Sequence, residues 1–421
     1  MPREGLRTTE GQEIVVLSAG LHNKDAGPDF FNADIVIDGE DWIGNVEIHS
    51  KSSDWYRHGH EKDKAYNNVV LHVVEVADAE VKTESGRIVP QLVLSVPDYV
   101  VNNYEHLQAF EDHPPCYRYA AGLPHLITDQ WIRRLCEERL ERKAAEIDAR
   151  LKYCEFNWEQ VFFITMARAF GFGVNGDTFE EWARTLPYSG AAKHRDDIFQ
   201  IEALFIGQAG LLEESVLSDR QRELADSDTY YQRLKSEYAF MANKFQISPL
   251  GGYKWKFLRL RPQNFPTLRL AQFASLYCGQ KLSLSAVMEA KDVKDLHRLL
   301  EVEVSPYWQS HYTLCSEEGD KSARHLQKPA LNLLVLNGIV PMVYAYGRYR
   351  QSKKIMEKAL DWLHTIDAED NKYTRLWTQM GLSVANAEES QAVIQLMTQY
   401  CQRKDCLRCN LGYQYIKVKK P

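Results

Sequence analysis

The residue pattern of the chain changes near residue 100, and this change constrains the fold more than any other feature. Residues 12–96 contain short runs rich in β-branched and aliphatic residues, namely 13–18, 34–38, 42–48, 69–76 and 91–96. Such runs, bounded by Gly, Asp, Asn or Ser, are typical of β-strands. After about residue 102, apolar residues recur at intervals of three and four, as in amphipathic helices. We therefore expect an α/β region, a small mixed sheet with flanking helices, followed by a mostly α-helical domain.

The best candidate for a domain boundary is His113-Pro114-Pro115, because proline interrupts regular structure. We predict an α/β domain at residues 1–112 and a helical domain at residues 113–421. The clearest helical pattern covers residues 128–151, with Thr128 or Asp129 as the N-cap. Further helices are predicted at 157–170, 197–212, 229–244, 332–346 and 351–366.

Composition excludes several classes of protein. The 421 residues are 44% hydrophobic, which suffices for a globular core, and the net charge of -7 argues against unspecific binding of polyanions. No run of 18 apolar residues indicates a membrane span, and the N-terminus lacks the apolar stretch of a signal peptide. We therefore expect a cytoplasmic protein. Eight cysteines are too few for a disulfide framework, so their thiols are expected to be reduced.

A polar pair interrupts the apolar run at 42–48. Side chains alternate along a strand, so Glu47 and His49 point to one face while Val46 and Ile48 point to the other, which we expect to be the core. Lys51 joins Glu47 and His49 if the strand continues. Histidines are also concentrated nearby, with His72 on the run at 69–76.

A predicted hairpin brings a second carboxylate to this pair. Residues 39–41 separate two strand-like runs, so the chain before them, including Asp29, returns toward Glu47. Two converging carboxylates suit Mg²⁺ or Mn²⁺, which lowers the pKa of a bound water. His58 and His60 would assist or position a substrate. Asp29 as a turn residue after a proline, and the two histidines as a surface loop, remain the alternatives.

Several segments resemble a bacterial family named DUF2851. They are GPDFFNADIVI, WIGNVEIHSKSSDWYRHGHEKDKAYNNVVLHVV, IEALFIGQAGLL, RLRPQNFPTLRLAQ, LNLLVLNGIVP and the tail with three cysteines. The resemblance covers nearly the whole chain, but it implies no function, because the family has none established.

A more distant resemblance is to the PD-(D/E)XK nucleases. Pro28-Asp29, seventeen residues, then Glu47-Ile48-His49 is similar to their motif, with His49 in place of the usual lysine. The resemblance implies that Asp29 and Glu47 bind the metal while His49 and Lys51 activate water or stabilise charge. It implies hydrolysis of phosphodiester bonds in DNA or RNA. The missing lysine leaves open a non-catalytic protein that keeps the fold and binds nucleic acid or acts as a scaffold.

A third interpretation places the chemistry on His58-x-His60-x-x-Asp63. This run is similar to the zinc-binding HxHxDH motif of metallo-β-lactamase-type hydrolases, although Asp63 stands one position late and no histidine follows it. It keeps a zinc hydrolase among the alternatives.

Cys401-x4-Cys406-x2-Cys409 offers three thiolates to one soft metal. We favour Cys116 as the fourth ligand, which predicts a zinc or iron–sulfur site. The spacing is similar to that in iron–sulfur members of the PD-(D/E)XK nucleases, although there the single cysteine precedes the nuclease core. Incidental thiols in a frayed tail are the alternative.

The stretch from 254 to 269 alternates cations with aromatic residues. Arg259, Arg261 and Arg269 would contact phosphates of DNA or RNA, and Trp255 would stack on a base. The alternative is a structural loop whose arginines pair with nearby acidic residues.

Overall fold

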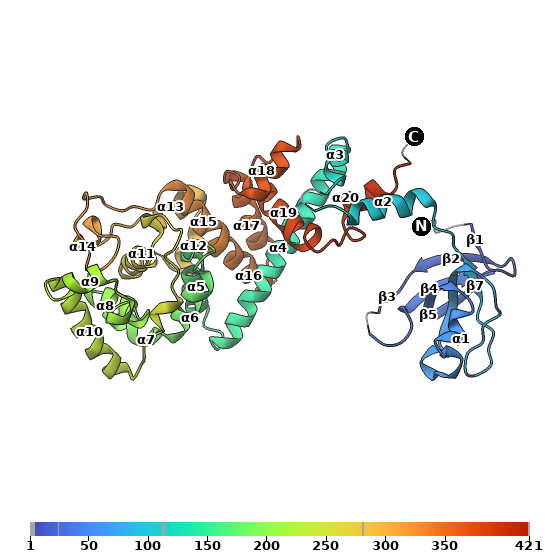
Figure 1. The fold of residues 1–421 in the computed structure, drawn as a ribbon, viewed down its shortest axis with the longest axis horizontal. Helices are drawn as coiled ribbons and strands as arrows, with labels where there is room; N and C mark the ends of the chain where they lie inside the picture. The colour runs from blue at the N-terminus through green and yellow to red at the C-terminus, as the bar shows by residue number, and fades with distance from the viewer. Residues whose placement is uncertain (1–4, 24, 112–113, 280–281, 420–421) are drawn as a thin grey trace. The chain divides into compact units, whose positions relative to one another are not determined.

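The computed structural model describes residues 5–23, 25–111, 114–279 and 282–419, so the predicted boundary at 112 and 113 lies outside the described residues. The chain forms two compact units (Figure 1). Unit 1 comprises Met1–Glu111 and Tyr413–Pro421, and unit 2 comprises Asp112–Gly412. The sequence assigned the last residues to the helical domain. They belong to unit 1, where the amide of Asn103 donates to the carbonyl oxygens of Ile416 and Val418 at 3.1 and 2.8 Å.

Unit 1 contains the predicted mixed sheet. Its strands are β1 (Leu6–Arg7), β2 (Glu13–Ser18), β3 (Leu21–His22), β4 (Phe30–Ile37), β5 (Glu40–Lys51), β6 (Val69–Val76) and β7 (Gln91–Val93). The order is β1-β2-β4-β5-β6-β7, with β3 paired to β4. Pairing is antiparallel from β1 to β5 and parallel between β5, β6 and β7. This confirms the predicted small mixed sheet followed by a mostly helical region.

The hairpin between β4 and β5 turns on two residues, Asp38 and Gly39. Both have positive φ, at 49° and 85°, which is the backbone of a type I′ turn and the reason that an Asp-Gly pair suits this position. The predicted loop at 39–41 is therefore one position late and one residue too long. Ile37 pairs directly with Glu40.

From its length and polarity, the stretch at 53–67 predicts one crossover helix, but the crossover between β5 and β6 is not a continuous helix. It consists of α1 (Asp54–Arg57) and two 3₁₀ turns, η1 (His60–Lys62) and η2 (Lys64–Tyr66). Gly59 breaks the helix with a left-handed φ of 78°. The crossover covers one face of the sheet with Trp55 and Tyr66, which pack with Val69, Val81 and Val89. The opposite face carries a larger core that includes Ile14, Ile35 and Leu71.

Unit 2 contains every helix predicted from periodicity. The pattern at 128–151 is α4 (His125–Tyr153), which begins earlier than predicted, directly after Pro124. The other five patterns correspond to α5 (Trp158–Phe170), α8 (Ile198–Gln208), α10 (Thr229–Phe245), α16 (Val340–Tyr349) and α17 (Lys353–Thr365). Figure 1 shows α4 beside α16 and α19 (Ala387–Gln395), and both pairs are in contact.

A wide turn interrupts the apolar helix at 328–349. Between α15 (Lys328–Leu334) and α16 lies a π-helical turn, Val335–Ile339. Pro341 has no N–H to donate to the carbonyl of Asn337, which favours the wider turn. A Cβ at Gly338 would lie 2.6 Å from the sulfur of Met166, so the helix packs closely on α5. Among described residues this helix alone meets the length and composition criteria for a membrane span, and 67% of its apolar window is buried, as in a core helix.

Candidate metal centre

Glu47 lies on the face of β5 that the crossover covers. Glu47 is 6% exposed. Its Oε1 atom is 3.4 Å from Nε2 of His49 and 3.3 Å from Nε2 of His60. The sequence analysis placed Glu47 outside the core and Ile48 inside it. The reverse holds at this end of the strand, because α1 and the 3₁₀ turns bury the Glu47 face and leave Ile48 44% exposed.

Three imidazoles converge beside this carboxylate. Ring nitrogens of His49, His58 and His60 all lie within 4.8 Å of one another, the one such group among the described residues. Nε2 of His49 is 3.1 Å from Nδ1 of His58. The ring of His60 stacks on His49 at 5.3 Å and on Tyr66 at 3.8 Å. Nε2 of His60 is buried and has no hydrogen-bond partner, although it faces Glu47.

His72 completes the cluster, and the sequence analysis gave it no role. It is fully buried on β6, and its Nε2 lies 2.9 Å from Nδ1 of His49. The parallel register pairs His72 with Glu47, which brings the histidine beside the site. Only the register between two strands reveals this neighbour, and alternation along one strand does not.

Asp29 is held next to Glu47 by backbone hydrogen bonds. Its own N–H donates to Oε2 of Glu47 at 3.1 Å, and its Oδ2 accepts from the N–H of Ile48 at 2.9 Å. The structure thus brings Asp29, Glu47 and His49 together, while Asp29 lies outside the group of three imidazoles. Lys51 ends β5, where its charge contributes to the lowered pKa of Asp78 and its N–H donates to Asp54.

Burial shifts the pKa values of the side chains in this cluster so that their neutral forms are favoured. Burial, reinforced by the charge of Asp29, raises the pKa of Glu47 to about 7. Burial and the neighbouring rings lower the pKa of His49 to about 4 and that of His72 to about 3. Burial also lowers the pKa of His60. Neutral imidazoles with free lone pairs are the form that binds a metal ion.

The donor atoms favour a transition metal. Imidazole nitrogen suits zinc, iron, nickel and copper, whereas Mg²⁺ prefers oxygen donors. The set of three imidazoles and one carboxylate therefore differs from the two-carboxylate magnesium site expected from the motif. His58 and His60, treated as a rival zinc site, lie in the same cluster as Glu47, so the two interpretations describe one centre.

The four cysteines singled out in the sequence lie near one another in unit 2, although among the described residues no three of their sulfur atoms all lie within 4.8 Å of one another. Cys116 begins α3 (Cys116–Ala120) and, like Cys401, Cys406 and Cys409, it is buried. Burial and the other cysteines raise the pKa of Cys116 to about 12, with Cys409 and Cys406 as the named neighbours. Cys116, Cys406 and Cys409 likewise act on the thiol of Cys401. Chain segments 285 positions apart thus meet at this cluster.

Two of the four residues assigned to nucleic-acid binding are buried. Trp255 is 5% exposed and donates from its ring nitrogen to the carbonyl of Ala209 at 2.7 Å, so it has no free face for a base. Arg269 is 6% exposed and donates to neighbouring amide oxygens. Only Arg259 and Arg261 are exposed. The interleaved cations and aromatics therefore do not form one surface.

Comparison with known proteins identifies a family. The sequence model of a family described as "Protein of unknown function (DUF2851)" matches residues 1–372. The match includes Cys116 and ends before the three C-terminal cysteines, so the similarity noted for the tail lies outside it. No curated protein and no solved structure matches the chain.

Proposed function

The chain belongs to the DUF2851 family, and we propose that unit 1 is a metal-dependent hydrolase centre acting on phosphodiester bonds of DNA or RNA. The proposal rests mainly on the buried Nε2 atom of His60, which makes no hydrogen bond although it lies 3.3 Å from the carboxylate of Glu47. A buried polar atom without a partner is costly, and a metal ion bound there removes the cost.

The chemistry follows from the donor set. His49, His58 and His60 would hold the ion, which when bound lowers the pKa of a bound water and polarises a phosphoryl oxygen. Glu47 would accept a proton from that water, since its Oε1 faces both buried rings. His72 would orient His49 through the 2.9 Å contact. His58 is exposed, so it would lie at the side from which a substrate enters.

The strand arrangement supports a phosphodiester substrate. Asp29 directly precedes β4, Glu47 lies on the neighbouring antiparallel strand β5, and the crossover leads into a parallel strand. This is the order expected from the resemblance to PD-(D/E)XK nucleases, with imidazoles in place of the motif lysine. Binding of nucleic acid without cleavage remains the rival function, and hydrolysis of another ester remains the second.

The test uses the full chain and one substitution at His60, whose Nε2 atom is the main support for the proposal. Elemental analysis of wild-type protein should find about one transition-metal ion per chain in excess of the cysteine site. Cleavage of single- and double-stranded DNA and RNA is then measured with Mg²⁺, Mn²⁺, Zn²⁺ and Fe²⁺ supplied in turn. His60→Asn should lose the ion and the cleavage, whereas His125→Gln, which removes an exposed imidazole on α4, should keep both.

Each outcome decides between the alternatives. Binding of nucleic acid by wild-type protein without cleavage under every metal supports the binding function. Hydrolysis of a model phosphate ester or carboxylic ester without any effect on nucleic acid supports the general hydrolase. A wild-type protein that binds no metal at the imidazoles contradicts the proposal.

We also propose that the four cysteines hold zinc or an iron–sulfur cluster that fastens the segment around Cys401–Cys409 to α3. The support is their common burial and mutual influence, and the N–H groups of Leu411 and Gly412, which partly offset the burial that raises the pKa of Cys409 to about 11. N–H donors to sulfur stabilise a metal-bound thiolate. Cys116→Ser should release the metal, while Cys154→Ser, another buried cysteine, should not. Absorbance near 400 nm would indicate iron–sulfur, and a wild-type protein without metal at these thiols would contradict the proposal.

A further inference from the structure

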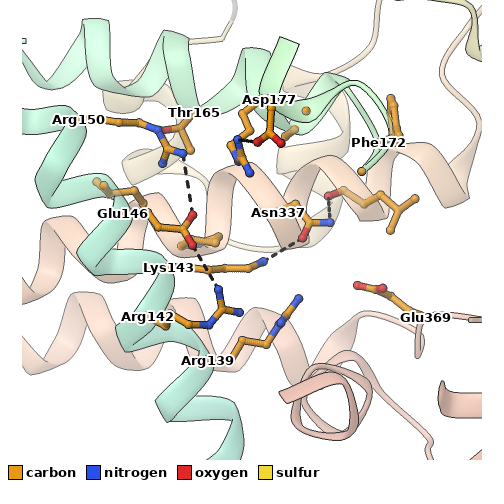
Figure 2. A pocket seen from close by; sticks show the side chains of 17 residues that line it. Arg139, Arg142, Lys143, Glu146, Arg150, Thr165, Phe172, Asp177, Asn337 and Glu369 are labelled. Carbon is orange, nitrogen blue, oxygen red and sulfur yellow. Dashed lines mark hydrogen bonds and ion pairs between the residues drawn. The ribbon is translucent and has the colours of Figure 1, made fainter. Parts of the chain in front are cut away.

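Unit 2 contains a cavity of about 410 Å³ that no function proposed above uses (Figure 2). It lies between α4, α5, α6 (Gly176–Thr185) and the interrupted helix at 328–349. Arg142 and Lys143 lie three and four positions after Arg139 on α4, so each is a neighbour of Arg139 on the helix surface, and Arg142 is paired with Glu146 at 3.2 Å. Figure 2 shows their charged ends gathered on one side of the cavity.

The arginines at the other side of the cavity are neutralised by carboxylates. Arg150 donates to both oxygens of Glu180 at 3.0 and 2.7 Å. Arg168 lies 2.6 Å from Asp177 and 3.1 Å from Glu180. Each of these two arginines thus has a carboxylate partner in contact, although Glu180 is also shared with Arg184.

Arg139 and Lys143 have only neutral partners. Nε of Arg139 donates to the amide oxygen of Gln391 at 2.5 Å. Nζ of Lys143 donates to the side-chain oxygen of Asn337 at 2.9 Å and lies 3.4 Å from the carbonyl of Leu336. Across the described part of the chain, no carboxylate lies within 4.0 Å of either cation. Two neighbouring positive charges therefore face the cavity without a carboxylate in contact, while Glu369 and Glu146, which also line the cavity, act on both charges from a greater distance.

A buried hydroxyl and a strained helix add polar groups to the same wall. Thr165 on α5 is 3% exposed, and its Oγ1 has no hydrogen-bond partner. Asn337 lies in the π-helical turn, a geometry often found at functional sites. Both residues line the cavity. Asn337 is satisfied by Leu333 and Lys143, so the hydroxyl of Thr165 is the group that could still donate to an acceptor oxygen of an occupant.

We propose that this cavity binds a small phosphorylated ligand with at least two negative charges, of the kind of pyrophosphate or a nucleoside diphosphate. A phosphoryl group offers several oxygens to a guanidinium fork, an ammonium and a hydroxyl at once, whereas a single carboxylate offers two oxygens and one charge. The volume is that of a small-molecule site. Burial and the charge of Arg139 lower the pKa of Lys143 to about 7 in the ligand-free protein, which agrees with a missing anion.

The test is calorimetric titration of the full chain with pyrophosphate, and separately with ADP. We expect binding of one equivalent, and a tenfold or greater loss of affinity in Arg139→Gln. Arg134→Gln is the matched control, because Arg134 lies on the same helix but is exposed and paired with Glu138 at 3.1 Å. It should bind as tightly as the wild type. Unchanged melting temperatures of both variants exclude unfolding as the cause.

The two ligands separate the two sources of the phosphoryl group. Equal affinity for pyrophosphate and ADP indicates that only the phosphates are recognised, while tighter binding of ADP indicates a nucleotide site. No binding of either ligand at millimolar concentration would overturn the proposal. An equal loss in Arg134→Gln and Arg139→Gln would also overturn it, because the attraction would then come from the general charge of α4.

Discussion

The imidazole cluster of unit 1 and the cationic cavity of unit 2 are both polar sites in partly buried surroundings, and burial lowers pKa values in both, but it removes the charge of the rings and not that of Arg139. In unit 1, burial lowers the pKa values of His49 and His72 to about 4 and 3, so the rings lose their charge near neutral pH. In unit 2, burial lowers the pKa of Arg139 only to about 10, so its charge remains. The first site is left with lone pairs and the second with excess positive charge.

The difference shows that the ability of a side chain to lose its charge determines which ligand a buried site can accept. Neutral imidazoles beside a carboxylate present electron pairs to a cation. Guanidinium groups stay protonated throughout the physiological range and require an anion. The two proposed ligands, a metal ion and a phosphorylated molecule, thus follow from one physical effect acting on two kinds of residue.

The largest expected effect comes from removing the lone pairs of unit 1. The double substitution His49→Asn and His60→Asn leaves Glu47 without the two rings that face it at 3.4 and 3.3 Å. We expect complete loss of the metal ion at this centre and at least a thousandfold loss of hydrolysis. Equilibrium dialysis against zinc and manganese measures the first effect. Retention of the ion would show that these two rings are not its ligands and would end the comparison.

The sequence predicted the features of unit 1 that depend on one local segment, and it did not predict those that depend on contacts between segments. The strands, and the shared face of Glu47 and His49, follow from alternation along one segment. The role of His72 did not, because it depends on the register between β5 and β6. The burial of Glu47 was also missed, since the crossover that covers it was expected to be one helix.

In unit 2 the sequence predicted helices but not the cavity. The arginines of α4 have the spacing of an ordinary solvent-exposed helix, and only packing against α5 and the helix at 328–349 turns them inward. Trp255 and Arg269 show the opposite error, since an exposed surface was expected and both are buried. Cys116 was predicted as the fourth ligand because a closed metal site requires four ligands. It lies near the C-terminal cysteines, and the metal itself stays a prediction.

A buried carboxyl in unit 2 tests whether loss of charge is general. Glu202 is 1% exposed and accepts from the hydroxyls of Tyr230 and Ser305 at 2.7 and 3.1 Å. Burial raises its pKa from 4.5 to about 7. The folded state therefore holds this proton more tightly than the unfolded chain, and the associated stability is present below pH 4.5 and lost as the pH rises through 7.

The measurement compares denaturation of wild-type protein with Glu202→Gln between pH 5 and 8. The shift corresponds to about 3 kcal/mol, so the stability of the wild type should fall relative to the variant by about that amount across the range. Glu223→Gln, at an exposed position, should follow the wild type. A constant difference between wild type and Glu202→Gln would show that the carboxyl stays charged when buried.

A smaller effect is expected from the residue that orients His49. His72→Phe keeps an aromatic ring of similar shape in the fully buried position but removes the nitrogen that lies 2.9 Å from His49. We expect affinity for the metal to fall about 10- to 100-fold, as for other groups behind a metal ligand. Fold stability without metal should fall by about 1 kcal/mol at most, because the lost contact with His49 is offset by removal of the buried Nδ1 of His72, which has no hydrogen-bond partner. Unchanged affinity in a competition titration with a chelator would remove His72 from the site.

The smallest effect concerns the stability that the protein without ligand loses because positive charges lie close together in the cavity of unit 2. The pKa of Lys143 is lowered from 10.5 to about 7, so the folded state holds this proton less tightly than the unfolded chain. The stability of ligand-free protein should therefore rise with pH between about 7 and 10. Lys143→Met removes the charge and keeps the length of the side chain. We expect it to stabilise the protein at pH 7 by roughly 1–2 kcal/mol, less than the full pKa shift implies, because solvent and counter-ions reach the cavity.

The same substitution should weaken binding of pyrophosphate, so stability and binding would change in opposite directions. Such opposite changes are typical of a residue selected for binding a ligand. If Lys143 were purely structural, removing its hydrogen bond to Asn337 would lower the stability of the protein. Chemical denaturation at pH 7 with and without pyrophosphate measures both effects in one experiment. If Lys143→Met is less stable than the wild type without ligand, Lys143 supports the π-helical turn instead, and the excess charge of unit 2 rests on Arg139 alone.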